Sequence, residues 1–178
     1  MKAAIRLFPV ILLMMFVPAH AEEDLLVPGF PAASDMPNAH ENPDPNTNYK
    51  VVFSVNRDAP TPEDMNPMFR AIAVYLNTLG KHGVPAEHRN IVAMIHHRSE
   101  QFDIVMSNEA YKARHGHDNP NIEIIRKLKE AGVSIRVCGQ GLAAREIDEK
   151  DVNPDIQIDL WAMTSIVNLT LAGYTHIG

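Results

Sequence analysis

Four short apolar runs, separated by longer stretches of helical pattern, constrain the fold of this 178-residue chain most strongly. Each run has the length and the β-branched content of a buried strand. The runs are YKVVFSVN (49–56), NIVAMIHH (90–97), VSIRVC (133–138) and IQIDL (156–160). Strands that alternate with helices over long connections predict an α/β fold. We expect a parallel sheet of about four to five strands with helices on both faces.

The stretches between these runs predict the helices. Apolar residues recur at i, i+3/i+4 and i+7 over residues 67–82, and a second amphipathic pattern covers 119–132. One or two short helices are expected between the second run and residue 119, and another short helix over 139–146. The last helix, 161–172, is apolar almost all round, which indicates either deep burial or a subunit interface.

The first 48 residues differ from the rest of the chain. Lys2 and Arg6 precede an apolar run over 7–17, and Ala19-His20-Ala21 has the small-x-small pattern of a cleavage site. Residues 1–21 therefore predict a cleavable signal peptide and a periplasmic protein with no membrane segment after cleavage. Residues 22–48, rich in proline and asparagine, predict an extended arm or linker. The α/β domain is expected over 49–178.

Charge and motif content give no support for binding of nucleic acids or of dinucleotide cofactors. The formal net charge is −6, and basic and acidic residues are interspersed, so no basic stripe predicts nucleic-acid binding. No Gly-x-Gly-x-x-Gly follows the first predicted strand, so dinucleotide binding has no support and we expect no cofactor.

Cys138 is the only cysteine, so it cannot form a disulfide within the chain. Exported proteins usually pair their cysteines or lack them, and a free cysteine is often a small buried hydrophobe. Cys138, however, ends the third predicted strand, and ligands bind at the carboxyl ends of parallel strands. A helix starting at Gly139 would lower the pKa of the thiol, and Gly139 and Gly141 would let the backbone wrap around the sulfur or an anion.

The other predicted strands end in polar or aromatic residues that we expect at the same edge of the sheet. Asn56 and Arg57 follow the first run, His96 and His97 end the second, and Trp161 follows the fourth. These residues are candidates to bind a ligand or to support Cys138. Only one of the two histidines can point to a given face. Arg136 is expected on the same face as Cys138.

The segment HGHDN (115–119) raises the alternative of a zinc or copper site through His115, His117 and Asp118. A structural zinc site needs about four converging ligands, and no partner cluster is evident. A solvated loop is therefore the favoured interpretation, and we expect no metal.

The segment IIRKLKEAGVSIRVCGQGLAAREIDEKDVNPDIQI (124–158) resembles the DsrE/DsrF-like family of sulfur-relay proteins. In that family a helix leads through Ala-Gly-Val to a strand ending in Cys-Gly. A short helix, an acidic turn, another strand and an apolar helix ending in Gly-Tyr (here Gly173-Tyr174) then follow. The resemblance covers about 49–178. The chain departs from the family in its signal peptide and in Asp159-Leu160-Trp161, where small residues are usual.

The resemblance implies a homo-oligomer, often a trimer or hexamer, in which Cys138 lies near a subunit boundary and carries sulfur as a persulfide. The leading hypothesis is thus a periplasmic sulfurtransferase or sulfur carrier that handles sulfane sulfur through Cys138. Its partner would be a sulfur donor or acceptor protein, or a small sulfur compound. The alternative is a non-catalytic oligomeric binding or assembly module in which Cys138 is structural.

Overall fold

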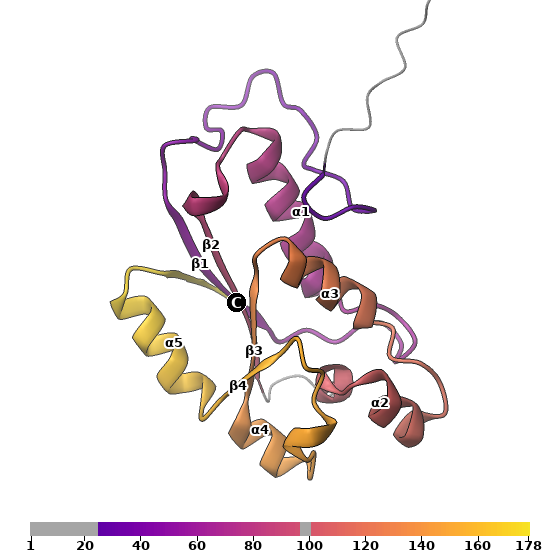
Figure 1. Ribbon diagram of the computed structural model, residues 1–178. Coiled ribbons are helices and arrows are strands. Elements are labelled where there is room, and N and C mark those ends of the chain that lie inside the picture. Colours follow the sequence, from indigo (N-terminus) through magenta and orange to yellow (C-terminus); the bar gives the residue numbers. More distant parts are fainter. Residues whose placement is uncertain (1–24, 97–100) are drawn as a thin grey trace, which may run out of the picture.

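The computed structural model describes residues 25–96 and 101–178, and these contain a five-stranded sheet (Figure 1). The strand order is β4-β3-β2-β1-β5, and every neighbouring pair is parallel. The strands are β1 Tyr49–Val55, β2 Arg89–Ile95, β3 Ser134–Cys138, β4 Gln157–Asp159 and β5 Thr175–Ile177. The predicted signal peptide and His97 lie outside the described residues.

Five helices connect and cover the strands. They are α1 Pro67–Lys81, α2 Asn108–His115, α3 Ile122–Glu130, α4 Gly139–Ala144 and α5 Ala162–Leu171, with 3-10 turns at Ala86–His88, Phe102–Val105 and Glu149–Asp151. Pro67 opens α1 at a position where proline is tolerated, and the Asn66 side chain accepts a hydrogen bond from the Met68 N–H. Across the described ranges, no helix has the length and apolar composition needed to cross a bilayer.

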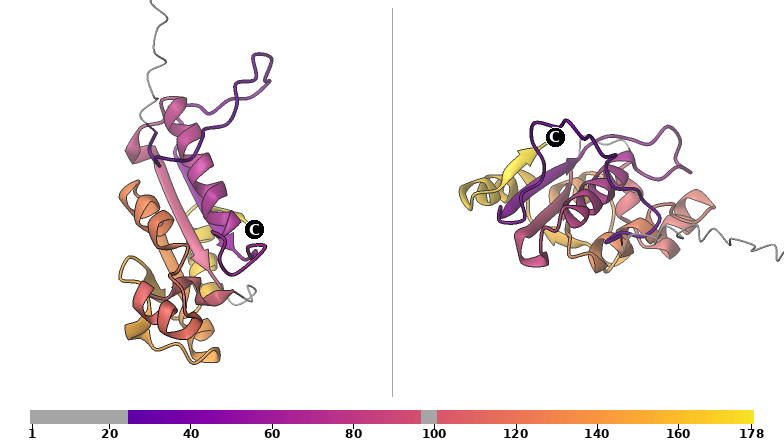
Figure 2. Two further views of the ribbon diagram at one scale, coloured as in Figure 1. Left: turned by 90° about the vertical axis from the view of Figure 1, so that its right-hand side faces the viewer. Right: turned by 90° about the horizontal axis from the view of Figure 1, so that it is seen from above.

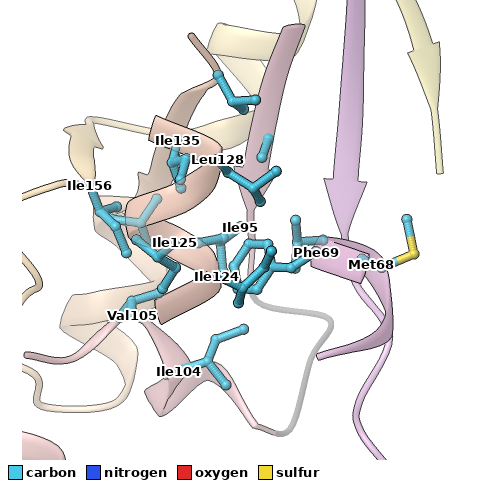
Figure 3. Close-up of a cluster of buried hydrophobic side chains, with 14 of the residues drawn as sticks. Met68, Phe69, Ile95, Ile104, Val105, Ile124, Ile125, Leu128, Ile135 and Ile156 are labelled. Atoms are coloured by element: carbon cyan, nitrogen blue, oxygen red, sulfur yellow. The ribbon is translucent and has the colours of Figure 1, made fainter. Parts of the chain in front are cut away.

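The pleat of the strands sorts side chains onto two faces of the sheet. Residues such as Val51, Phe53 and Ile95 point toward α1 and α3, where the main core forms (Figure 3). Val52 and Met94, one position away, point toward α5. Figure 1 shows α5 on one side of the strands and α1 and α3 on the other. The predicted α/β fold, a parallel sheet with helices on both faces, is therefore confirmed.

The two faces are covered unequally. Packed on the α5 side is a small buried cluster made of Val52, Val92, Met94, Cys138, Ala162 and Leu169. Helix α5 buries only Ala162 and Leu169, whereas Leu171 is 82 % exposed. This ten-residue helix packs on the sheet through one side, and its other side is exposed. The expectation that the helix is deeply buried within one protomer was therefore wrong. The interface alternative stays a prediction.

Strand β5 was not expected from the sequence. It has only three residues, all exposed, and it joins the sheet through the pairs Val51–Thr175, Val52–His176 and Phe53–Ile177. The Lys50 ammonium, which donates to the Ala172 carbonyl at 3.1 Å, ties the turn before β5 to β1. Tertiary pairing, rather than local propensity, makes this strand.

The segment of the arm from Leu25 to Met36 is docked on α1. Val27 is fully buried, and its backbone N–H donates to the Asn77 side-chain oxygen at 2.8 Å. The Asn77 amide nitrogen donates in turn to the carbonyls of Val27 (3.0 Å) and Phe30 (2.7 Å). Figure 2 shows this indigo segment beside α1, at the opposite end of the molecule from α2 and α4. One buried amide thus pairs three backbone groups of the arm.

Replacing Asn77 with alanine tests the docking of the arm. The change leaves buried backbone groups of Val27 and Phe30 without partners, so we expect the free energy of unfolding to fall by about 2–3 kcal/mol. Urea unfolding measures the loss. The control is Asn42→Ala, at an exposed position of the arm, which should change stability little. Equal stability of the two variants would contradict the docking.

Candidate functional site

A pocket of about 220 Å³ opens at the carboxyl edge of the sheet, where ligand sites of parallel sheets lie. We call it the carboxyl-edge pocket. It is lined by Ser54, Asn56, His96, Trp161, Ala162, Met163, Ile166, His176 and Gly178. The structure therefore brings together three of the residues singled out in the sequence, Asn56, His96 and Trp161. The ends of β1, β2 and β5 supply the polar side, and the start of α5 supplies the apolar side.

Ser54 and His176 form a close polar pair in this pocket. The Ser54 Oγ lies 2.7 Å from the His176 Nε2, and Ser54 itself is 2 % exposed. Neither residue was predicted from the sequence. His176 was missed because it lies on strand β5, which was not predicted. A weak signal existed for Ser54, which shares its pleat parity with Val52 and Asn56 and therefore the α5 face.

Cys138 lies beside the pocket but does not line it. Its thiol is fully buried, and the Sγ accepts a hydrogen bond from the Ala162 N–H at 3.3 Å. The sequence predicted support from the start of α4, yet the Cys138 side chain makes no capping bond there. The thiol instead points to the α5 face of the sheet and meets the start of α5. Ala162 also lines the pocket, so one residue both donates to the sulfur and forms part of the pocket wall.

Arg136 lies two residues before Cys138 on β3, and Asp159 ends the neighbouring outer strand β4. The Arg136 guanidinium lies 3.7 Å from the Asp159 carboxylate, and its Nε donates to the Ser134 hydroxyl at 3.0 Å. Asp159 is the register partner of Cys138 between β3 and β4. The guanidinium is thus engaged by a neighbouring carboxylate on the edge of the sheet.

Two other predicted residues are not in the pocket. Arg57 is exposed, and its backbone carbonyl accepts a 2.7 Å hydrogen bond from the Asn66 side-chain amide. Its side chain is absent from the described lining of the pocket. His97, the alternative to His96, falls outside the described residues.

Gly139 and Gly141 meet other parts of the chain instead of the sulfur. A Cβ on Gly139 would lie 3.0 Å from the Asp159 carbonyl oxygen, and one on Gly141 would lie 2.6 Å from the Phe102 ring. Gly139 therefore lets the β4–α5 connection approach α4, and Gly141 lets a fully buried ring pack on the same helix. These contacts give both glycines a packing role, and their expected role in wrapping a sulfur or anion stays a prediction.

In the HGHDN segment His115, Gly116 and Asp118 are exposed, His117 is partly exposed, and Asn119 is buried. The His115 Nε2 lies 3.0 Å from an Asp103 carboxylate oxygen. Hydrogen bonds from Lys112 and Asn108 hold the pKa of the Asp118 carboxyl below its usual value. Within the described chain, no three His, Cys, Asp or Glu side chains are grouped so that they could hold a metal ion. The zinc or copper alternative for these residues therefore has no structural support.

Gly141→Ala tests the packing role of this glycine. Alanine favours a helix, but here its Cβ forces the buried Phe102 ring to move, so we expect a loss of about 1–3 kcal/mol, typical of overpacking. Thermal or urea unfolding measures it. In a Phe102→Leu background the ring is absent, and the same glycine substitution should lose most of its effect. An unchanged penalty in that background would show that the Phe102 contact is not its cause.

The comparison with family models agrees with the resemblance seen in the sequence. A solved structure of a protein of unknown function, MTH1491 from Methanobacterium thermoautotrophicum, is 16% identical, with a TM-score of 0.45, and the match covers 72% of this chain and 97% of that one. No curated protein matches the chain. The family model described as the DsrE/DsrF-like family matches residues 50–178, well over half of the chain. The chain therefore belongs to the DsrE/DsrF-like family.

Proposed function

We propose that this protein is exported to the periplasm after cleavage following Ala21, and that it handles sulfane sulfur as a persulfide on Cys138. The observation that carries the proposal is the position of the family's strand-end cysteine. In this chain that residue is the only thiol, and it touches the start of α5 beside the carboxyl-edge pocket. Family membership supplies the expectation of sulfur chemistry.

The proposed reaction is a sulfur transfer without net oxidation. The Cys138 Sγ attacks the terminal sulfur of a persulfide donor, R–S–S⁻, and a new S–S bond forms as the donor's S–S bond breaks. The thiol proton passes to the leaving group, which departs as R–SH, and Cys138 keeps the sulfur as Cys–S–S⁻. The Ala162 N–H at the start of a ten-residue helix would stabilise negative charge on the sulfur.

Burial of the thiol sets a condition on this reaction. Ala162, Leu169 and the partly buried Ile166 of α5 pack in the cluster that contains Cys138. A donor reaches the sulfur only when the first turn of α5 moves away from β3. We therefore expect Cys138 to react through a local opening of α5, and the reaction to be slower than that of an exposed thiol.

We further propose that the protein forms a homo-oligomer, a trimer or hexamer, through the outer side of α5. We define the α5 surface as the exposed residues Leu160, Trp161, Met163, Val167 and Leu171. These apolar side chains lie together on one short helix and the residues before it, and contiguous apolar surface of this kind marks interaction sites. A second copy of the chain would cover them and bring a subunit boundary close to Cys138.

A second candidate function has its own support. The thiol is fully buried, packs against Val92 and Met94, and accepts a hydrogen bond from Ala162. These contacts also suit a structural cysteine in a non-catalytic assembly module. The two candidates differ in whether the folded protein takes up sulfur.

Intact-mass analysis after incubation with glutathione persulfide separates the two candidates. We expect the folded wild type to gain the mass of one sulfur atom, and Cys138→Ser to gain none, since no other thiol is present. The mass before incubation should correspond to a chain beginning at Glu22. An adduct that forms only after unfolding would identify Cys138 as a structural thiol and overturn the sulfur-handling proposal.

The oligomer is tested by Val167→Glu on the α5 surface. A carboxylate in a buried apolar interface is strongly unfavourable, so we expect the variant to sediment as a monomer and the wild type as a trimer or hexamer. Met36→Glu, a similar change at an exposed apolar residue of the arm, is the control and should keep the wild-type state. A wild-type monomer, or an unchanged Val167→Glu oligomer, would contradict the proposed interface.

A further inference from the structure

We propose that the carboxyl-edge pocket binds a small organic anion that has an apolar group and a negatively charged sulfur-containing head, of the form R–S–S⁻ or R–SO₂–S⁻. Its role as the sulfur donor to Cys138 rests on the function proposed above. Its binding in the pocket rests on the shape and chemistry of the pocket alone.

The apolar side of the pocket has room for a small hydrocarbon group. Trp161, Met163 and Ile166 line it from α5, and the pocket measures about 220 Å³. An engineered apolar cavity of about 150 Å³ is large enough to bind benzene. The carboxyl-edge pocket therefore accommodates a group of ring size together with a compact head, whereas a bare inorganic anion would leave the apolar side unfilled.

The Ser54–His176 pair carries one polar hydrogen more than its own contact uses. Ser54 and a neutral His176 have two polar hydrogens between them, one on the hydroxyl and one on the imidazole, and their 2.7 Å contact uses one. If the imidazole donates, the Ser54 hydroxyl hydrogen remains; if the hydroxyl donates, the second imidazole nitrogen carries the remaining hydrogen. Protonation of His176 adds another donor and a positive charge. The Asn56 amide adds hydrogen-bonding groups to the same wall.

Hydrogen-bond donors on two sides of the pocket suit an anionic head. Among the described residues that line it, none has an Asp or Glu side chain, two (His96 and His176) carry imidazoles, and the last residue, Gly178, also forms part of the wall. The first turn of α5 also faces the pocket through Ala162 and Met163, and N–H groups in the first turn of a helix carry partial positive charge. A negatively charged sulfur or sulfonyl head is thus matched by donors from two sides.

The pocket also lies where a donor for Cys138 would have to bind. Ala162 lines the pocket, and its N–H contacts the Cys138 Sγ at 3.3 Å. A ligand that displaces the first turn of α5 would meet the thiol next. Binding and sulfur transfer can therefore be measured separately, with a ligand that cannot give up sulfur.

The test is a titration of the purified protein with benzenesulfonate, followed by the imidazole NMR signals of the histidines. Benzenesulfonate has the shape and charge of an organic thiosulfonate but no sulfane sulfur. We expect saturable shifts of the His96 and His176 signals. The affinity for benzenesulfonate should be about tenfold higher than for sulfate, which lacks the apolar group, and about tenfold higher than for methyl phenyl sulfone, which lacks the charge. A tenfold difference corresponds to one apolar contact or one charge-assisted hydrogen bond.

Variants localise the binding. Ser54→Ala and His176→Gln should each weaken benzenesulfonate binding about tenfold. His40→Gln, at an exposed arm position outside the pocket, should leave it unchanged. Ser54→Ala removes only a hydroxyl, so it remains informative if His176→Gln disturbs β5. No saturable shift, equal binding of sulfate, or equal loss in His40→Gln would overturn the proposal.

Binding of benzenesulfonate can be measured whether or not Cys138 takes up sulfur. Benzenesulfonate bound by Cys138→Ser with wild-type affinity supports the pocket, even if the wild-type thiol takes up no sulfur from glutathione persulfide. Sulfur loading of Cys138 with no benzenesulfonate binding supports sulfur handling and overturns the pocket as the donor site.

Discussion

The parallel pairing of β1, β2 and β3 is the interaction on which the rest of the structure depends. In this register Val51, Ile91 and their pleat partners point toward α1 and α3 and build the main core. The same alternation turns Val52, Met94 and Cys138 to the opposite face. Because the three strands run in one direction, Asn56 and His96 follow strands that end at the same edge as Cys138. The core and the candidate site are therefore two consequences of one pairing pattern.

The unequal cover of the two faces links the fold to the proposed function. The α1 and α3 face has a large core, extended by the arm through Asn77 and Val27. The other face has one short helix, whose first residue contacts the only thiol and whose outer side is apolar and exposed. In the proposed function, α5 serves both purposes: it opens to let a donor reach Cys138, and a second subunit covers its outer side.

Much of this architecture followed from sequence pattern. The four predicted strands and the helices over 67–82 and 119–132 agree with β1–β4, α1 and α3 to within a few residues, because their apolar periodicity is set by burial against the sheet. Strand β5 could not be predicted, since three exposed residues have no periodicity and are a strand only through pairing with β1. His176 was missed with it, and so was its pair with Ser54.

Other features depended on contacts between segments far apart in the sequence. The glycines after Cys138 stood out in the sequence, but their neighbours are Phe102 and the Asp159 carbonyl, which no local pattern reveals. The helix that meets the thiol is α5, 24 residues further on, and α4 makes no capping bond to it. Local sequence thus placed Cys138 at the edge of the sheet, whereas its partners came from long-range packing.

The most direct test of the account is the urea dependence of the rate at which Cys138 takes up sulfur from glutathione persulfide, measured below the unfolding transition. If the first turn of α5 opens locally, little surface is exposed, and the rate should be nearly independent of urea. A rate that rises with the full m-value of global unfolding would mean that the thiol reacts only in the unfolded chain, and would contradict a sulfur-handling role for the folded protein.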